Sequence, residues 1–116
     1  MRQAIRRLLD AQPGIELVGE AADFAQTIQM ANDLKPQVIV MDLHMPNDSN
    51  LTPRDVQSRL HQSSRLLAIS IWNDEETKAL AKRFGAAALL DKTDLGKKLV
   101  PAIRQLVLPT GGAGLP

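Results

Sequence analysis

Short apolar runs recur along this chain, and polar or turn-forming residues separate them. Runs of this length are typical of strands buried in a sheet. They predict strands in "IELVGEA" at residues 15–21, at residues 37–42, in "RLLAISI" at residues 65–71 and in "AAALLD" at residues 86–91. The alternation in the first run is weak, so only a short strand is expected there.

Between these runs, apolar residues return at the three- and four-residue spacing of one helix face. The spacing predicts a helix before Pro13, then helices that begin after Asp23, after Thr52 and after Asn73, and a last one over residues 95–106. The residues at the predicted ends have the chemistry of helix caps. They are Asp23 with Gln26, Thr52 followed by Pro53, Asn73 with Glu76, and Gly85 as a left-handed residue after the helix that ends at Phe84.

Strands that alternate with helices in this order predict a doubly wound α/β fold, in which helices cover both faces of a parallel sheet. Such folds bind and react at the carboxyl ends of their strands. Asp42, Ser70 and Lys92 each stand at or just past a predicted strand end. We therefore expect these three polar side chains to meet at one edge of the sheet.

Composition narrows the classes of function. The 116 residues suit one domain, and a formal charge of +1 provides no basic footprint for DNA or for an anionic membrane surface. There is no cysteine, which excludes disulfides and thiolate sites and fits a reducing cytoplasm. No apolar run approaches the length of a membrane span. Residues 109–116 have the composition of a linker or tail after a domain over residues 1–108.

The three strand-end residues suit phosphoryl transfer. A carboxylate can attack phosphorus and form an acyl phosphate, and the reaction depends on neutralising charge on the phosphoryl oxygens. Lys92 and the Ser70 hydroxyl are suitable donors, one charged and one neutral. A Mg²⁺ ion normally completes such a site.

Three stretches resemble the receiver domain of bacterial two-component response regulators: "VIVMDLHMP" at residues 38–46, "LLAISIW" at 66–72 and "AALLDKTD" at 87–94. The resemblance implies a flavodoxin-like fold and a switch rather than an enzyme. It implies that a sensor histidine kinase phosphorylates Asp42, that Ser70 is the switch hydroxyl and that Lys92 contacts the phosphate. "RRLLDAQPGIELVGEAAD" at residues 6–23 resembles the subfamily with a helix-turn-helix DNA-binding output domain, which implies transcription regulation.

The chain departs from that family at its start, because it begins inside what corresponds to the first helix. The expected fold is therefore an N-terminally truncated receiver in which the first strand, and the acidic pair that holds Mg²⁺ at its end, are absent. Of the family's metal ligands, the Asp42 carboxylate and the His44 backbone carbonyl are present, which predicts a weak site. Either residues 15–21 pair with residues 37–42, or a second chain supplies a strand and makes a homodimer.

Other interpretations start from the same loop. Asp42 and His44 match the start of the cobalamin-binding D-x-H-x-x-G loop, but Asn47 occupies the glycine position. A haloacid-dehalogenase-like phosphatase needs a second aspartate two residues after its nucleophile. His44 occupies that position, which argues against a hydrolase of this class. Trp72, just past the third strand, is interpreted as a partly buried cover over the active edge, and a contact for a partner is the alternative. A phosphorylation-independent interaction or dimerisation module remains the alternative to a phosphorylated switch.

Overall fold

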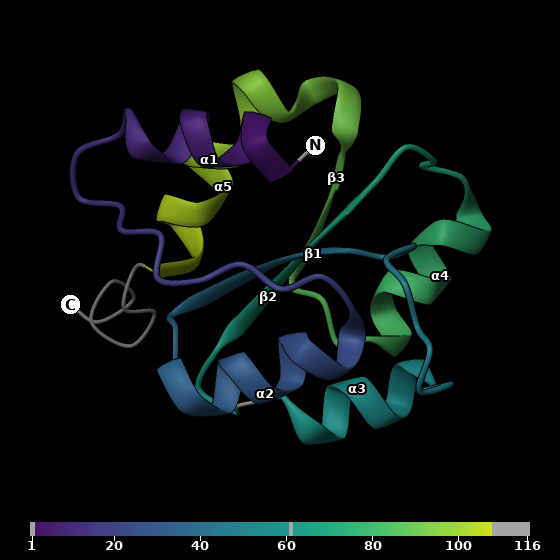
Figure 1. Ribbon diagram of the computed structural model, residues 1–116. Helices are drawn as coiled ribbons and strands as arrows, with labels where there is room; N and C mark the ends of the chain where they lie inside the picture. Colours follow the sequence, from purple (N-terminus) through teal and green to yellow (C-terminus); the bar gives the residue numbers. More distant parts are fainter. Residues whose placement is uncertain (1, 61, 108–116) are drawn as a thin grey trace, which may run out of the picture.

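A parallel sheet with helices on both faces forms the centre of the molecule (Figure 1). The computed structural model describes residues 2–60 and 62–107, so the predicted tail and the last residue of the predicted domain lie outside it. Within that range the sheet has strands β1 (Val38–Asp42), β2 (Arg65–Ser70) and β3 (Ala88–Asp91), in the order β1-β2-β3. The predicted doubly wound, flavodoxin-like fold is confirmed.

The helices divide between the two faces of this sheet. Their bounds are α1 (Arg2–Asp10), α2 (Phe24–Leu34), α3 (Pro53–Arg59), α4 (Glu75–Arg83), a short 3₁₀ helix η1 (Lys92–Asp94) and α5 (Leu95–Val107). Helices α1 and α5 lie together on one face, while α2, α3 and α4 cover the other (Figure 1). No helix in the described ranges is long and apolar enough to cross a membrane.

Alternating side chains of β2 supply both cores, because successive residues of a strand point to opposite faces. Leu67 and Ile69 pack with Leu99 and its neighbours from α1 and α5, whereas Leu66 and Ala68 pack with α2, α3 and α4. All five β2 residues from Leu66 to Ser70 are buried. The strand that ends at Ser70 is therefore the most deeply buried strand of the sheet.

The helix ends follow local capping chemistry. Asp23 accepts a hydrogen bond from the Gln26 backbone N–H at 2.7 Å, and Thr52 forms a reciprocal capping box with Asp55, as the start of α3 at Pro53 requires. Gly85 has φ +81°, so its predicted left-handed conformation after α4 is confirmed.

The predicted cap at Asn73 is wrong by one residue. The Asp74 carboxylate accepts the Thr77 backbone N–H at 2.8 Å, and α4 begins at Glu75. Asn and Asp are comparable caps, so the choice between adjacent candidates depends on which side chain reaches an N–H two or three positions ahead.

The predicted strand at residues 15–21 is not formed, and the predicted pairing of this segment with residues 37–42 is wrong. In the described part of the chain β1 pairs with β2 alone. Side chains hold the segment instead: Ile15 and Leu17 pack against the cluster under α1 and α5, and Glu20 forms a 3.0 Å ion pair with Arg6. Its apolar side chains thus find partners without a backbone ladder.

Candidate functional site

Asp42 and Lys92 meet across the carboxyl end of β2. Asp42 ends β1 and Lys92 directly follows β3, and each strand is a neighbour of β2. The two outer strands are roughly 10 Å apart, a distance that the long lysine side chain can span. Its Nζ lies 2.5 Å from Asp42 Oδ2, and the side chains of Lys92 and Asp42 are only 16% and 26% exposed. The fold therefore holds one cation directly against the carboxylate.

The second carboxylate oxygen of Asp42 is held by the backbone. Oδ1 accepts the N–H of His44 at 2.8 Å. The intervening Leu43 donates its N–H to the Ile69 carbonyl at 3.1 Å, which continues the β1 pairing one residue past the strand. Within the described ranges each oxygen of Asp42 has one donor, and a carboxylate can accept further hydrogen bonds or a ligand on its remaining lone pairs.

Ser70 lies between these two residues in the sheet but is engaged elsewhere. It is fully buried at the end of β2, opposite Asp91 in the register. Its Oγ accepts the Trp72 backbone N–H at 3.0 Å. Among the described residues no hydrogen bond joins Ser70 to Asp42. The sequence placed Ser70 at the correct edge of the sheet without indicating this local turn.

An exposed aromatic pair lies beside the carboxylate, and the sequence analysis did not predict it. The rings of His44 and Trp72 contact each other edge to face, with centroids 4.7 Å apart and an 83° interplanar angle. Trp72 is half exposed. The two residues come from the loops after β1 and β2, so only the neighbouring positions of these strands bring the rings together.

Asp91, the other carboxylate at this edge, is occupied by its own turn. It caps η1, and Thr93 donates to its Oδ1 from the backbone N–H and from the hydroxyl, each at 2.9 Å. These bonds, the backbone bond first, lower the pKa of the Asp91 carboxyl. Asp91 is therefore a stable anion with a structural role at the start of η1.

The predicted Mg²⁺ ligands fit a metal ion poorly by themselves. Mg²⁺ requires near-octahedral coordination by oxygen ligands. The ligands predicted here, the Asp42 carboxylate and the His44 carbonyl, belong to one short turn, and no group of three metal-ligating side chains occurs in the described ranges. These residues could contribute to a metal site, but they do not form a complete one.

The comparisons with known proteins concern the family and the fold of this chain. The family model of the response regulator receiver domain matches residues 1–104. The chain is 32% identical over 105 residues to the nitrate/nitrite response regulator protein NarL of Escherichia coli, covering 90% of this chain and 49% of that protein. It is 29% identical over 104 residues to the transcriptional regulatory protein LiaR of Bacillus subtilis, with the same shares covered.

The fold has a close match among solved structures. The response regulator domain of Thermotoga maritima CheB superposes with a TM-score of 0.76 at 27% identity, covering 91% of this chain and 87% of that one. This chain spans about half the length of the curated relatives named above. The match over residues 1–104, with the same fold, shows that this chain belongs to the response regulator receiver domain family.

Proposed function

We propose that Asp42 is the phosphoacceptor of this receiver domain. A carboxylate oxygen of Asp42 attacks the phosphorus of a phosphohistidine, a new O–P bond forms, and the P–N bond breaks. The departing imidazole keeps the bonding electron pair and takes up a proton. The product is an acyl phosphate on Asp42, and its formation changes the charge at the edge of the sheet.

The contact between Asp42 and Lys92 carries this proposal. A phosphoryl group on Asp42 Oδ1 or Oδ2 brings its oxygens close to the lysine ammonium, which already lies 2.5 Å from Oδ2. The His44 backbone N–H, 2.8 Å from Oδ1, is a second donor next to the attacking group. Preorganised donors of this kind stabilise the negative charge of the transition state without having to reorganise.

Ser70 is assigned the role of the switch hydroxyl. It is fully buried and its Oγ now accepts the Trp72 N–H, which leaves the hydroxyl proton available to a phosphoryl oxygen. A turn of the Ser70 hydroxyl toward Asp42 would change the environment of the loop that begins at Ile71. That loop carries Trp72 and its contact with His44, so the change would reach the surface.

Receiver domains generally bind Mg²⁺ at the phosphorylation site and interact with histidine kinases. For this chain we propose that Asp42 and the His44 carbonyl contribute to the metal site, together with ligands from outside the described residues. We propose a sensor histidine kinase as the phosphodonor. LiaR is named a transcriptional regulatory protein and is about twice as long as the matched region, so we also propose a DNA-binding output domain and a role in transcription.

Mapping the phosphate tests the assignment of Asp42. We expect that incubating the natural protein that carries this chain with acetyl phosphate and Mg²⁺ places one phosphate on the peptide containing Asp42, and that Asp42→Asn abolishes it. Asp48→Asn, a change in the neighbouring exposed loop, should leave the labelling unchanged. A phosphate on Asp48 or Asp91 would contradict the proposal, and a folded protein that takes no label would favour the phosphorylation-independent module.

The homodimer predicted from the sequence stays a prediction. The edge of β1 away from β2 has no backbone partner in the described ranges, and an open strand edge can pair with a strand of another chain. We expect sedimentation velocity to show a dimer whose population rises with protein concentration. A single monomeric species over the whole accessible concentration range would exclude it.

A further inference from the structure

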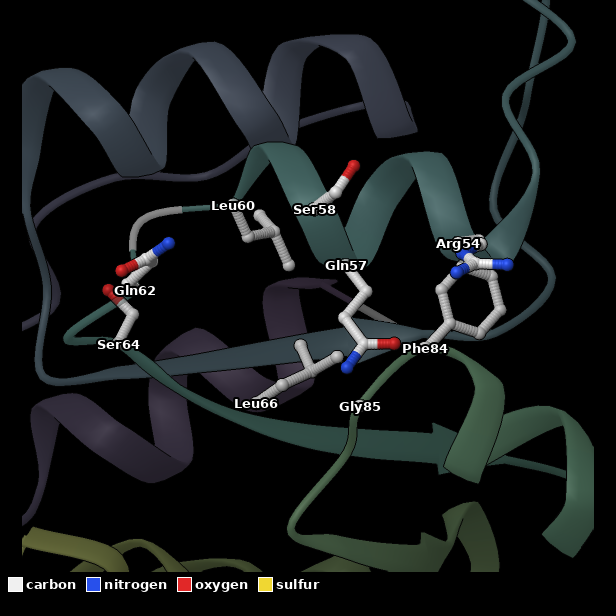
Figure 2. A pocket seen from close by; sticks show the side chains of 9 residues that line it. All are labelled: Arg54, Gln57, Ser58, Leu60, Gln62, Ser64, Leu66, Phe84 and Gly85. Atoms are coloured by element: carbon white, nitrogen blue, oxygen red, sulfur yellow. The ribbon is translucent and has the colours of Figure 1, made fainter.

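Two adjoining cavities lie between α3, the start of β2 and the end of α4, away from Asp42. Together they are called the groove below. The first has a volume of about 550 Å³ and the second about 430 Å³, and Arg54 and Gln57 line both. Figure 2 shows the first cavity from close by. It is lined by Arg54, Gln57, Ser58, Leu60, Gln62, Ser64, Leu66, Phe84 and Gly85. Both are open to solvent, and their lining combines polar and apolar side chains.

The first cavity has an apolar floor. Leu60 from the end of α3, Leu66 from β2 and Phe84 from the end of α4 line it, and these residues are 8%, 5% and 4% exposed. The Gln57 side chain extends from α3 toward Leu66 and Gly85 (Figure 2). It lies so close to the backbone there that a Cβ at Gly85 would be 2.8 Å from its amide nitrogen. The glycine thus leaves room for the Gln57 side chain, which lines both cavities.

Two arginines line these cavities. Arg54 borders both cavities, and Arg83 from the last turn of α4 borders the second. Within the part of the chain that the structure describes, neither guanidinium forms an ion pair with a carboxylate. A guanidinium binds carboxylates and phosphates through paired hydrogen bonds, so this end of the groove is suited to an anion.

We propose that this groove binds a small organic anion with an apolar body. The anionic group contacts Arg54 and Arg83, and the apolar body lies on Leu60, Leu66 and Phe84. The lining residues account for both parts of the ligand. A purely apolar molecule would form no hydrogen bonds with the two arginines, and an inorganic anion would leave the apolar floor exposed to water.

The groove is separate from the phosphoacceptor site. It touches β2 near Leu66, at the amino end of the strand, whereas Ser70 and the Asp42–Lys92 pair are at the carboxyl ends. A ligand there does not compete with phosphate for Asp42. The proposal therefore stands independently of phosphorylation, and Asp42→Asn should bind the same ligand equally well.

Four simple probes separate the two halves of the proposed ligand. Phenylacetate carries both, phenylacetamide has the same shape without the charge, acetate has the charge without the apolar body, and a short polyglutamate peptide offers acidic side chains on a macromolecular backbone.

Titration of ¹⁵N-labelled protein is followed at the backbone and side-chain amides of Gln57 and at the Gly85 amide. We expect saturable shifts with phenylacetate at a Kd of about 1 mM, a value reasonable for roughly ten non-hydrogen atoms.

The variants test the contacts. Arg54→Gln should weaken phenylacetate binding about 10-fold, as the loss of a charge-assisted hydrogen bond predicts, and Arg83→Gln should weaken it less. Arg59→Gln is the matched control, because Arg59 is an exposed arginine of the same helix that lines neither cavity. It should leave the Kd unchanged within twofold.

Several results would overturn the proposal. No saturable shift at these amides with phenylacetate would exclude the ligand class, and equal binding of phenylacetamide or of acetate would show that one half of the ligand is not recognised. Equal effects of Arg54→Gln and Arg59→Gln would show a general charge effect. Arg54-dependent binding of polyglutamate without binding of phenylacetate would assign the groove to an acidic protein segment instead.

Discussion

Replacing Lys92 with glutamine is expected to slow phosphorylation of Asp42 on the order of 100-fold, as removal of one preorganised electrostatic donor does elsewhere. The ammonium lies 2.5 Å from Asp42 Oδ2 and is largely shielded from water, so solvent cannot readily replace it. The measurement is the initial rate of acyl phosphate formation from acetyl phosphate under fixed Mg²⁺, with circular dichroism to show that the variant is folded.

Lys98→Gln provides the control for this prediction. Lys98 forms a 3.6 Å ion pair with Asp94 on the surface near the start of α5, and both side chains are well exposed. An exposed pair of this kind contributes little, so the rate should stay within twofold of that of the unmodified protein. If Lys92→Gln left the rate equally unchanged, Lys92 would have only a structural role in the sheet edge.

Leu99→Ala is expected to lower the free energy of unfolding by about 2 to 5 kcal/mol, the usual cost of removing a buried leucine side chain and leaving a cavity. Leu99 is fully buried in the middle of α5, where it packs with Leu67 and Ile69 of β2. This loss is a large part of the roughly 5 to 15 kcal/mol that stabilises a typical domain. Urea unfolding followed by fluorescence of Trp72 measures it.

Leu34→Ala is the matched change. Leu34 is the last residue of α2, so the change is again from leucine to alanine in a helix. It is 46% exposed, and its replacement should cost about 1 kcal/mol or less. Equal losses for the two variants would mean that the α5 face of the sheet is not the well-packed core described above.

The binding of an anion in the α3–α4 groove would add a second input to a receiver domain. Phe84 and Gly85 lie in the groove and connect α4 to β3, and β3 leads directly to Lys92. The chain thus links the groove to the phosphoacceptor edge through one short strand. Measuring phosphorylation with and without phenylacetate would show whether this link carries any coupling.

The sequence by itself determined the order of the elements, most helix ends and the edge of the sheet on which Asp42, Ser70 and Lys92 lie. Caps such as Asp23 and Thr52 could be predicted because their hydrogen bonds reach only two or three residues along the chain. The common edge could be predicted because parallel strands that alternate with helices all end on the same side. The caps require only hydrogen bonds between residues close in sequence, and the common edge requires only that the strands run in the same direction.

Only the tertiary structure decided which of these segments pair and which side chains touch. The sequence pattern of residues 15–21 suited a strand, but a strand requires a backbone partner, and here Ile15 and Leu17 pack on helices while β1 pairs with β2 alone. The contact between His44 and Trp72 likewise depends on how the loops after β1 and β2 are placed. Such contacts join residues from different segments, so their energies depend on packing that no local pattern records.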